Sequence, residues 1–284
     1  MSAHAQPLMV ERSGWRFFVP AGARDHATAI CDELLGQALT AVDGARGRPH
    51  RRSRHATTYR IRPTSSGAIT GEVFLKILDA PVGLDRLKRM VRGSRTRHVA
   101  AITARLNAFG FSAPAVLMYG CERAGGREVI AIRRADGDGP FATMMAIESA
   151  PLMHKRAILR AVGREVARLH RCGFVHGDLT PHNILAVRDE PPRFIFIDHE
   201  RTRRAFPFGR RHRQLRNLVQ LGRFNLPGLT CRDRLRVLDA YAAASGVRNR
   251  GAFERRVARM LARRLKRDGA GVRCATANPR NIAR

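Results

Sequence analysis

Three polar side chains in the second half of the chain have the types and the spacing that phosphate chemistry requires. Asp178 and Asn183 lie five positions apart, and Asp198 follows the apolar run RFIFI. Strands are predicted at NILAV and RFIFI, and two adjacent strands that end in polar groups would bring the three side chains together. Transfer of a phosphoryl group from ATP needs one carboxylate to orient the attacking hydroxyl, and an amide and a second carboxylate to hold Mg²⁺ against the phosphates.

The segments around these residues are predicted to be mainly helical. The stretch 151–173 has apolar residues at helical spacing, a proline suited to the first turn and a glycine suited to the end. We expect this part to form one lobe over residues 136–270, with a disordered tail at residues 271–284. Three further helices are predicted, at RQLRNLVQLG, CRDRLRVLDAYAAAS and AFERRVARMLARRLKR.

Residues 1–135 are predicted to form a smaller, β-rich lobe. The runs TTYRI, EVFLKIL and REVIAI are rich in branched residues and are separated by turn-forming stretches. One main helix is predicted over residues 95–110, where apolar residues recur at helical spacing. The expected fold class is therefore α+β, with two lobes.

The formal charge of +30 is the most unusual bulk property of this 284-residue chain. Such a surplus attracts polyanions such as nucleic acid, anionic lipid or phosphorylated glycans. The alternative for many individual arginines is a solvated surface. The sequence has no apolar run of about 18 residues and no pattern typical of a secretion signal, so we expect a cytosolic protein. Its five cysteines are scattered, which predicts neither a zinc site nor a disulfide framework.

The order of these residues resembles that of protein-kinase-like enzymes. His176-x-Asp178-x-x-x-x-Asn183 resembles their catalytic loop, and Ile197-Asp198 resembles their metal-binding segment, with His-Glu in place of the usual Phe-Gly. Lys76, at the end of EVFLK, resembles the strand lysine that contacts the nucleotide phosphates. The resemblance implies a two-lobed protein-kinase-like fold with ATP and Mg²⁺ between the lobes. It makes Asp178 the catalytic residue and Asn183 and Asp198 the metal ligands.

Two kinase features are missing from the first lobe. The stretch RRSRHATTYRI lacks a G-x-G-x-x-G pattern, so Ser53, Thr57 and Thr58 are the candidates to cover the phosphates through backbone N–H groups and hydroxyls. The helix at residues 95–110 contains no acid that could hold Lys76, which leaves Glu72 and Asp79 as possible partners.

The region after Asp198 resembles the lipopolysaccharide core kinases of Gram-negative bacteria, the heptose and Kdo kinase group. The matching segments are I-D-x-x-R at residues 197–201, the leucine-rich helix at 215–221 and D-R-x-R-x-L-x-A-Y at 233–241. The resemblance covers residues 50 to 245. It implies phosphorylation of a heptose or Kdo hydroxyl of the lipopolysaccharide inner core, with the protein peripheral on the cytoplasmic face of the inner membrane.

That implication gives several of the basic residues a role. Arg201, Arg203 and Arg204 become candidates for binding the acceptor, because guanidinium groups bind phosphate and carboxylate well. The helix at residues 252–267 has apolar residues on one face and arginines on the other, which suits either a membrane surface or packing on the second lobe.

Three alternatives remain open. A pseudokinase would bind lipopolysaccharide or a partner without catalysis, and the missing helix glutamate favours it. A phosphotransferase of the aminoglycoside or choline type is favoured by the letters HGDL, although its cationic acceptors would prefer an acidic groove. A kinase associated with nucleic acid is compatible with the charge alone.

Overall fold

The protein is described by a computed structural model, which divides the chain into two compact units. The first contains residues 1–108 and 113–135, and the second contains residues 109–112 and 136–284. The division falls after Ala135, where the sequence pattern changes from strands to helices. The described residues are 6–21, 27–28, 30–34, 50–53, 55–62, 71–83, 93–124, 126–137, 139, 141, 151–187, 191–224, 226 and 228–267.

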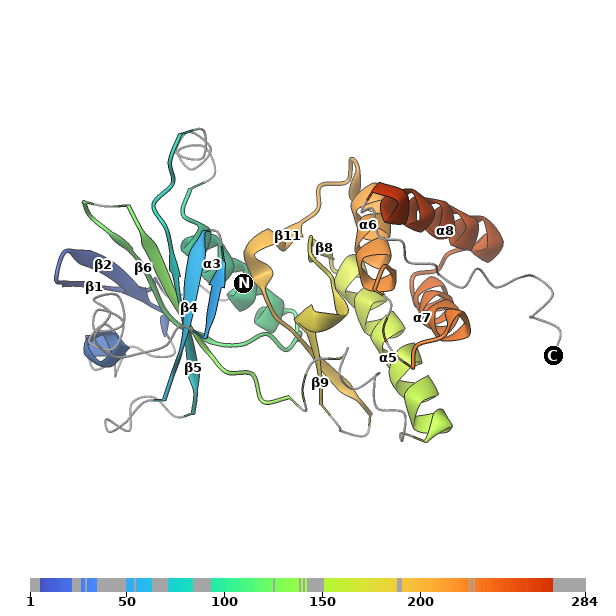
Figure 1. Ribbon diagram of the computed structural model, residues 1–284, viewed down its shortest axis with the longest axis horizontal. Coiled ribbons are helices and arrows are strands. Elements are labelled where there is room, and N and C mark those ends of the chain that lie inside the picture. Colours follow the sequence, from blue (N-terminus) through green and yellow to red (C-terminus); the bar gives the residue numbers. More distant parts are fainter. Residues whose placement is uncertain are drawn as a thin grey trace. The chain divides into compact units, whose positions relative to one another are not determined.

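The first unit is built on an antiparallel sheet, which has seven strands in the described part of the chain, in the order β1-β2-β6-β7-β5-β4-β3 (Figure 1). The strands predicted at TTYRI, EVFLKIL and REVIAI correspond to β4, β5 and β7. The bounds are β1 Leu8–Arg12, β2 Trp15–Val19, β3 Arg51–Ser53, β4 Ala56–Ile61, β5 Val73–Leu78, β6 Val116–Glu122 and β7 Glu128–Arg133.

The two faces of this sheet bury different clusters. Alternate residues of β5, including Leu75, pack with Phe17 and Met118 on one face. On the other face Leu78 packs with Val99 of α3 (Arg95–Ala108), the helix predicted at residues 95–110. Because side chains alternate along a strand, Lys76 lies on the same face as α3.

A buried carboxylate on β7 holds the start of α3. Glu128 is 3% exposed and accepts hydrogen bonds from Thr96 N, Thr96 Oγ1 and Ser94 Oγ at 2.8–2.9 Å. The first backbone N–H groups of a helix lack intrahelical partners and carry partial positive charge, so a carboxylate there stabilises the helix. Glu128 therefore links α3 to the sheet.

The second unit is mainly helical, as the sequence predicted. The helices predicted at residues 151–173, 213–222, 231–245 and 252–267 are all present (Figure 1). Among its described residues the strands form two short antiparallel pairs, β9 with β10 and β8 with β11. The bounds are α5 Leu152–Arg171, β8 Phe174–Val175, β9 Ile184–Val187, β10 Arg193–Phe196, β11 Arg203–Arg204, α6 Arg210–Gly222, α7 Cys231–Ala244 and α8 Arg250–Arg267. The predicted tail at residues 271–284 lies outside the described residues.

The apolar face of α8 packs within the second unit. Phe253 and Val257 are 7% and 4% exposed, and the ring of Phe253 stacks on Tyr241 of α7 with centroids 5.7 Å apart. Of the two roles open for this helix, the structure shows packing. In the described part of the chain no helix is long and apolar enough to cross a membrane.

Helices α5 and α7 pack so closely that one position on α5 admits only glycine. A Cβ on Gly163 would lie 2.4 Å from the carbonyl oxygen of Val237 and 3.0 Å from Cβ of Ala240. Both distances are shorter than van der Waals contact, so any side chain would force the helices apart.

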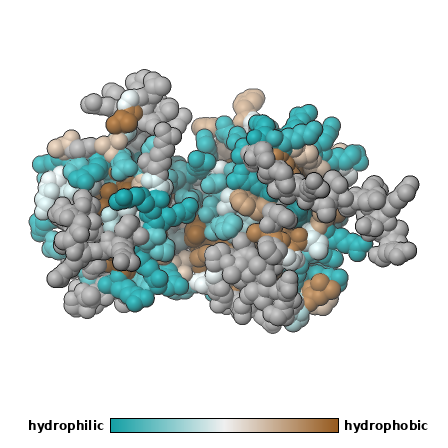
Figure 2. All heavy atoms as spheres, in the orientation of Figure 1, coloured by the Kyte–Doolittle hydropathy of each residue, from teal (hydrophilic) through white to brown (hydrophobic). Residues whose placement is uncertain are grey.

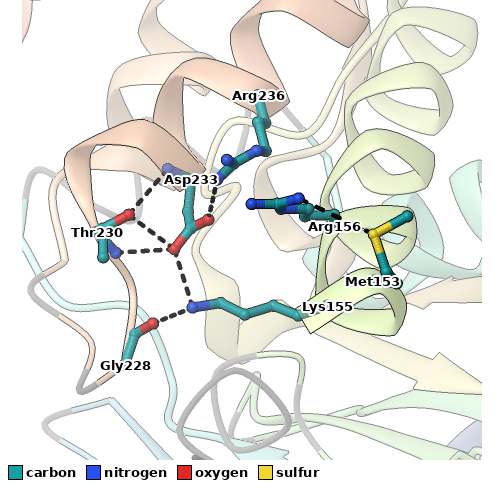
Figure 3. A network of polar contacts seen from close by, with 7 residues as sticks. All are labelled: Met153, Lys155, Arg156, Gly228, Thr230, Asp233 and Arg236. Atoms are coloured by element: carbon teal, nitrogen blue, oxygen red, sulfur yellow. Dashed lines mark hydrogen bonds and ion pairs between the residues drawn. The ribbon is translucent and has the colours of Figure 1, made fainter. Parts of the chain in front are cut away.

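A buried ion pair holds the first turn of α7 against α5 (Figure 3). Asp233 accepts from Thr230 N and Oγ1, and Thr230 Oγ1 accepts from Asp233 N, which makes a capping box. Lys155 Nζ of α5 lies 2.9 Å from Asp233 Oδ2, and Arg236 lies 2.6 Å from Oδ1. Burial alone would raise the pKa of Asp233, but the bonds from Lys155 and Thr230 outweigh burial and lower it.

We predict that Asp233→Ala lowers the free energy of unfolding by about 3 kcal/mol, because it removes the cap and leaves Lys155 without its buried partner. Asp239→Ala removes an exposed carboxylate from the same helix and should cost less than about 0.5 kcal/mol. Urea denaturation of the two variants measures the difference. Equal losses would show that the network contributes nothing specific.

Candidate active site

The loop that carries Asp178 and Asn183 is closed by its own hydrogen bonds. The carbonyl oxygen of Asp178 accepts from Asn183 Nδ2 and from Thr180 N, both at 2.9 Å, and Asn183 N donates to Thr180 O at 3.0 Å. These bonds bring Asn183 next to Asp178 despite the four residues between them. The bond from Nδ2 also leaves Oδ1 as the atom of Asn183 that suits a metal.

Asp198 lies at the same end of the β9–β10 pair as Asn183. The strands are antiparallel, with Ile184 opposite Phe196, and Ile197 N donates to Asn183 O at 3.0 Å. Asp198 adopts the left-handed backbone conformation, with φ 63° and ψ 64°. Both proposed metal ligands therefore offer side-chain oxygens, the atom type that Mg²⁺ prefers, and the residues present fit this ion.

A buried histidine joins the two loops. His176 is fully buried, and its Nε2 donates to the carbonyl oxygen of Ile197 at 3.0 Å. Burial lowers the pKa of His176 to about 4. The ring is therefore neutral, and its hydrogen bond connects the loop of Asp178 to the residue before Asp198.

Gly177 allows the two loops to approach one another closely. Its φ is 77°, and a Cβ at this position would lie 2.4 Å from the carbonyl oxygen of Arg201. Glycine is thus required both by the backbone conformation and by the lack of space.

Helix α6 positions the catalytic loop through two amide side chains that the sequence analysis did not single out. Asn217 Oδ1 accepts from His176 N at 2.9 Å, and Asn217 Nδ2 donates to Gln220 Oε1 at 2.9 Å. Gln220 Nε2 donates to the carbonyl oxygen of Gly177 at 2.8 Å. Gln220 Oε1 also accepts from Leu179 N at 3.3 Å, so the backbone on both sides of Asp178 is anchored to α6.

A second buried histidine extends this network to α5 and α7. His170 Nε2 donates to Asn217 Oδ1 at 3.2 Å, so Nδ1 accepts the hydroxyl proton of Tyr241 at 2.9 Å. Burial lowers the pKa of His170 to about 4. Tyr241, the last residue of the D-R-x-R-x-L-x-A-Y segment, is thus a structural residue.

Asp178 lines a basic pocket of about 450 Å³ within the second unit. The described lining residues come from the catalytic loop, the segment after β10, α6 and α8. Among them are one carboxylate, that of Asp178, and five arginines, namely Arg201, Arg216, Arg223, Arg264 and Arg267. Hydrophilic side chains cover much of the visible surface near α6 and α8 (Figure 2).

Only one of the three arginines predicted to bind the acceptor is among the described residues lining this pocket, Arg201. Arg203 and Arg204 are exposed on β11, and the guanidinium of Arg204 lies 5.8 Å from the ring centroid of Phe109. Of the other lining arginines, Arg216, Arg264 and Arg267 lie on predicted helices, and Arg223 directly follows the helix predicted at residues 213–222. Their convergence required the packing of α6 and α8.

In the first unit, strand pairing places one of the phosphate-covering candidates next to Lys76. Thr58 is opposite Lys76 and shares its face of the sheet, whereas Thr57 is opposite Ile77 and points to the other face. Ser53 ends β3 and donates its hydroxyl to the carbonyl oxygen of Ala56.

The two acids considered as partners of Lys76 differ in their surroundings. Glu72 accepts hydrogen bonds from Arg60, Arg62 and Arg134, and the bonds from Arg60 and Arg62 lower its pKa to about 2. The Glu72 carboxylate therefore binds these three arginines. The backbone N–H of Asp79 donates to His55 O at 3.1 Å, next to the β3–β4 hairpin.

Comparison with known families shows the family to which the chain belongs. The model of the lipopolysaccharide kinase (Kdo/WaaP) family matches residues 72–241, which is more than half of the sequence. The chain belongs to this family. The matched region contains Lys76 of β5, the catalytic loop, Asp198 and the capping box of α7.

Individual relatives share shorter regions with this Kdo/WaaP family member. It is 30% identical over 105 residues to the KEOPS complex subunit Bud32 of Pyrococcus abyssi, which is 37% of this chain and 44% of the relative. It is 29% identical over 137 residues to a probable serine/threonine-protein kinase BUD32 homolog of Archaeoglobus fulgidus, or 45% of this chain and 60% of the relative. The chain thus spans about half the length of these curated relatives.

Among solved structures, the kinase domain of Mycobacterium tuberculosis PknI is similar at 19% identity. The alignment covers 72% of this chain and 75% of that domain, with a TM-score of 0.39.

We predict that acidification from about pH 6.5 to pH 5 lowers the free energy of unfolding. Burial, with the neighbouring His176 as a second cause, lowers the pKa of His199 to about 3, and burial lowers those of His170 and His176 to about 4. In the unfolded chain each of these histidines has a pKa of about 6.5. The unfolded chain therefore binds more protons in this window, so stability is complete above it and is lost as the pH falls towards 4.

Urea denaturation at several pH values measures this proton uptake. His199→Phe should reduce the uptake by about one proton relative to the native protein. Stability that stays constant or rises between about pH 6.5 and pH 5 would contradict the prediction.

Proposed function

We propose that this protein is an ATP- and Mg²⁺-dependent kinase that phosphorylates a heptose or Kdo hydroxyl of the lipopolysaccharide inner core. The observation that carries the proposal is the arrangement of the site within a chain of the Kdo/WaaP family, in which Asn183 is hydrogen-bonded to Asp178 and to the residue before Asp198. Asp178 orients the acceptor hydroxyl and accepts its proton.

Each of the remaining residues has a role in this proposal. Asn183 Oδ1 and the Asp198 carboxylate hold Mg²⁺, which when bound neutralises charge on the phosphates. Lys76 contacts the phosphates, and Thr58, on the same face of the sheet, is the better placed of the two threonines to assist it. Asn217 and Gln220 fix the loop backbone, so Asp178 needs little reorganisation before reaction.

A second candidate function is phosphorylation of a protein. Similarity to a KEOPS complex subunit Bud32 and to a probable serine/threonine-protein kinase favours it. The two functions share the catalytic loop and differ in the acceptor. The basic pocket beside Asp178 supports the anionic glycolipid.

A peripheral position on an anionic membrane belongs to the same proposal. Phe206 and Phe208, in the segment between β11 and α6, are 77% and 93% exposed. Arginines lie on both sides of this segment in the sequence, at Arg203 and Arg211 among others. Aromatic side chains flanked by basic residues suit the interface of a bilayer that contains anionic lipid.

We predict that labelled phosphate passes from Mg-ATP to dephosphorylated inner-core lipopolysaccharide with the native protein, and that Asp178→Ala lowers the rate by at least about a hundredfold. Casein as the alternative acceptor tests the protein-kinase function. Label in casein and none in the glycolipid would favour the second candidate. Label in neither, while the glycolipid is still bound, would favour a pseudokinase.

We also predict that the double change Phe206→Ser and Phe208→Ser weakens binding to phosphatidylglycerol-containing vesicles by at least about tenfold, because two apolar side chains no longer enter the interface. The matched control is Leu152→Ser with Met153→Ser, which alters two exposed apolar residues at the start of α5. Vesicle flotation measures both. Equal binding by the two double variants would exclude the 206–208 segment as the membrane contact.

A further inference from the structure

We infer that the pocket formed by α6 and α8 binds the acceptor sugar through at least two anionic groups on it, and that Arg264 and Arg267 of α8 determine specificity for such acceptors. The inference rests on the proposed kinase activity and adds the residues that recognise its acceptor. The acceptor that they would recognise is a sugar that carries carboxylate or phosphate groups beside the hydroxyl to be phosphorylated.

The position of the pocket supports an acceptor rather than a nucleotide. Gly177 and Asp178 are among the residues that line it, so a hydroxyl of a molecule bound there lies within reach of the Asp178 carboxylate. Asn183 and Asp198, the proposed metal ligands, are not among the described lining residues. The phosphates of ATP belong with the metal, which leaves the pocket for the other reactant.

The charge of the pocket selects the acceptor. Five arginines face one carboxylate among the described lining residues, and His212 adds a further nitrogen donor. A guanidinium group binds a carboxylate or phosphate through two parallel hydrogen bonds, so several of them favour a ligand with more than one anionic group. A cationic acceptor would be repelled, which argues against the aminoglycoside or choline type.

The pocket is lined by residues from several segments of the second unit, which the fold brings together. Arg216 and Arg223 come from the α6 region, whereas Arg264 and Arg267 lie on the last turns of α8. The buried residues Phe253 and Val257 hold α8 against the unit, and this packing brings the two sets of arginines to one cavity. Its volume of about 450 Å³ lies in the range of sites for small molecules, so it suits a sugar rather than a nucleic-acid duplex.

The test is the double change Arg264→Gln and Arg267→Gln, which keeps helix-forming side chains but removes two positive charges. We expect the KM for inner-core lipopolysaccharide to rise by at least about tenfold while the KM for ATP stays the same. The matched control is Arg255→Gln with Arg259→Gln, which removes the same charge from exposed positions of α8 that are not among the described residues lining the pocket. If the KM for lipopolysaccharide rose equally in both double variants, the effect would be explained by general electrostatic attraction, and the inference would be overturned.

A binding measurement separates this inference from the proposed activity. Titration calorimetry without nucleotide, using deacylated inner-core oligosaccharide as the probe, measures affinity whether or not phosphate is transferred. Weaker binding by the Arg264→Gln, Arg267→Gln variant than by the control supports the pocket even if the native protein transfers no label, in which case only the activity fails. Equal affinity in the native protein and this variant overturns the pocket even if transfer is observed.

Discussion

Asn217 is the buried amide on which the position of the catalytic loop depends. It is 1% exposed, and its oxygen accepts from both the backbone N–H of His176 and the ring of His170. A buried polar group that loses its partner is costly, so the arrangement of α5, α6 and the loop is fixed by the need to satisfy this side chain. Gln220 extends the same constraint to Gly177, and Tyr241 extends it to α7. Four segments of the second unit are thereby held in one arrangement around Asp178.

Much of this architecture could be predicted from local patterns. Helices α5 to α8 were visible as apolar residues at helical spacing, and strands β4, β5 and β7 as runs of branched residues. The segment H-x-D-x-x-x-x-N and the following Ile-Asp could be recognised because phosphoryl transfer needs fixed residue types at short spacing. Strands β1, β2 and β6 were not predicted individually, because the sequence analysis expected only that this lobe is rich in strands. The order of the strands in the sheet could not be predicted, because pairing depends on contacts between distant segments.

The contacts that connect distant segments were not predictable. Nothing near Asn217 or Gln220 in the sequence shows that they hold the loop some forty residues earlier. Glu128 is similar, since its partners at the start of α3 precede it by more than thirty residues. The arginines chosen first were those beside Asp198 in the chain, and the packing of α8 brings others to the pocket. Local patterns thus indicate the chemistry, and the tertiary fold determines which side chains surround it.

The backbone conformation of Asp198 limits the substitutions that the site can accept. A left-handed conformation at φ 63° disfavours residues with a bulky or branched Cβ, whereas Asp, Asn and Gly adopt it at lower cost. The proposed metal ligand needs a carboxylate on a short side chain at the same point. Steric and chemical selection therefore converge on aspartate. A change to asparagine would keep the conformation and remove only the charge, a change to glycine would remove the side chain and keep the turn, and a change to valine would disturb both.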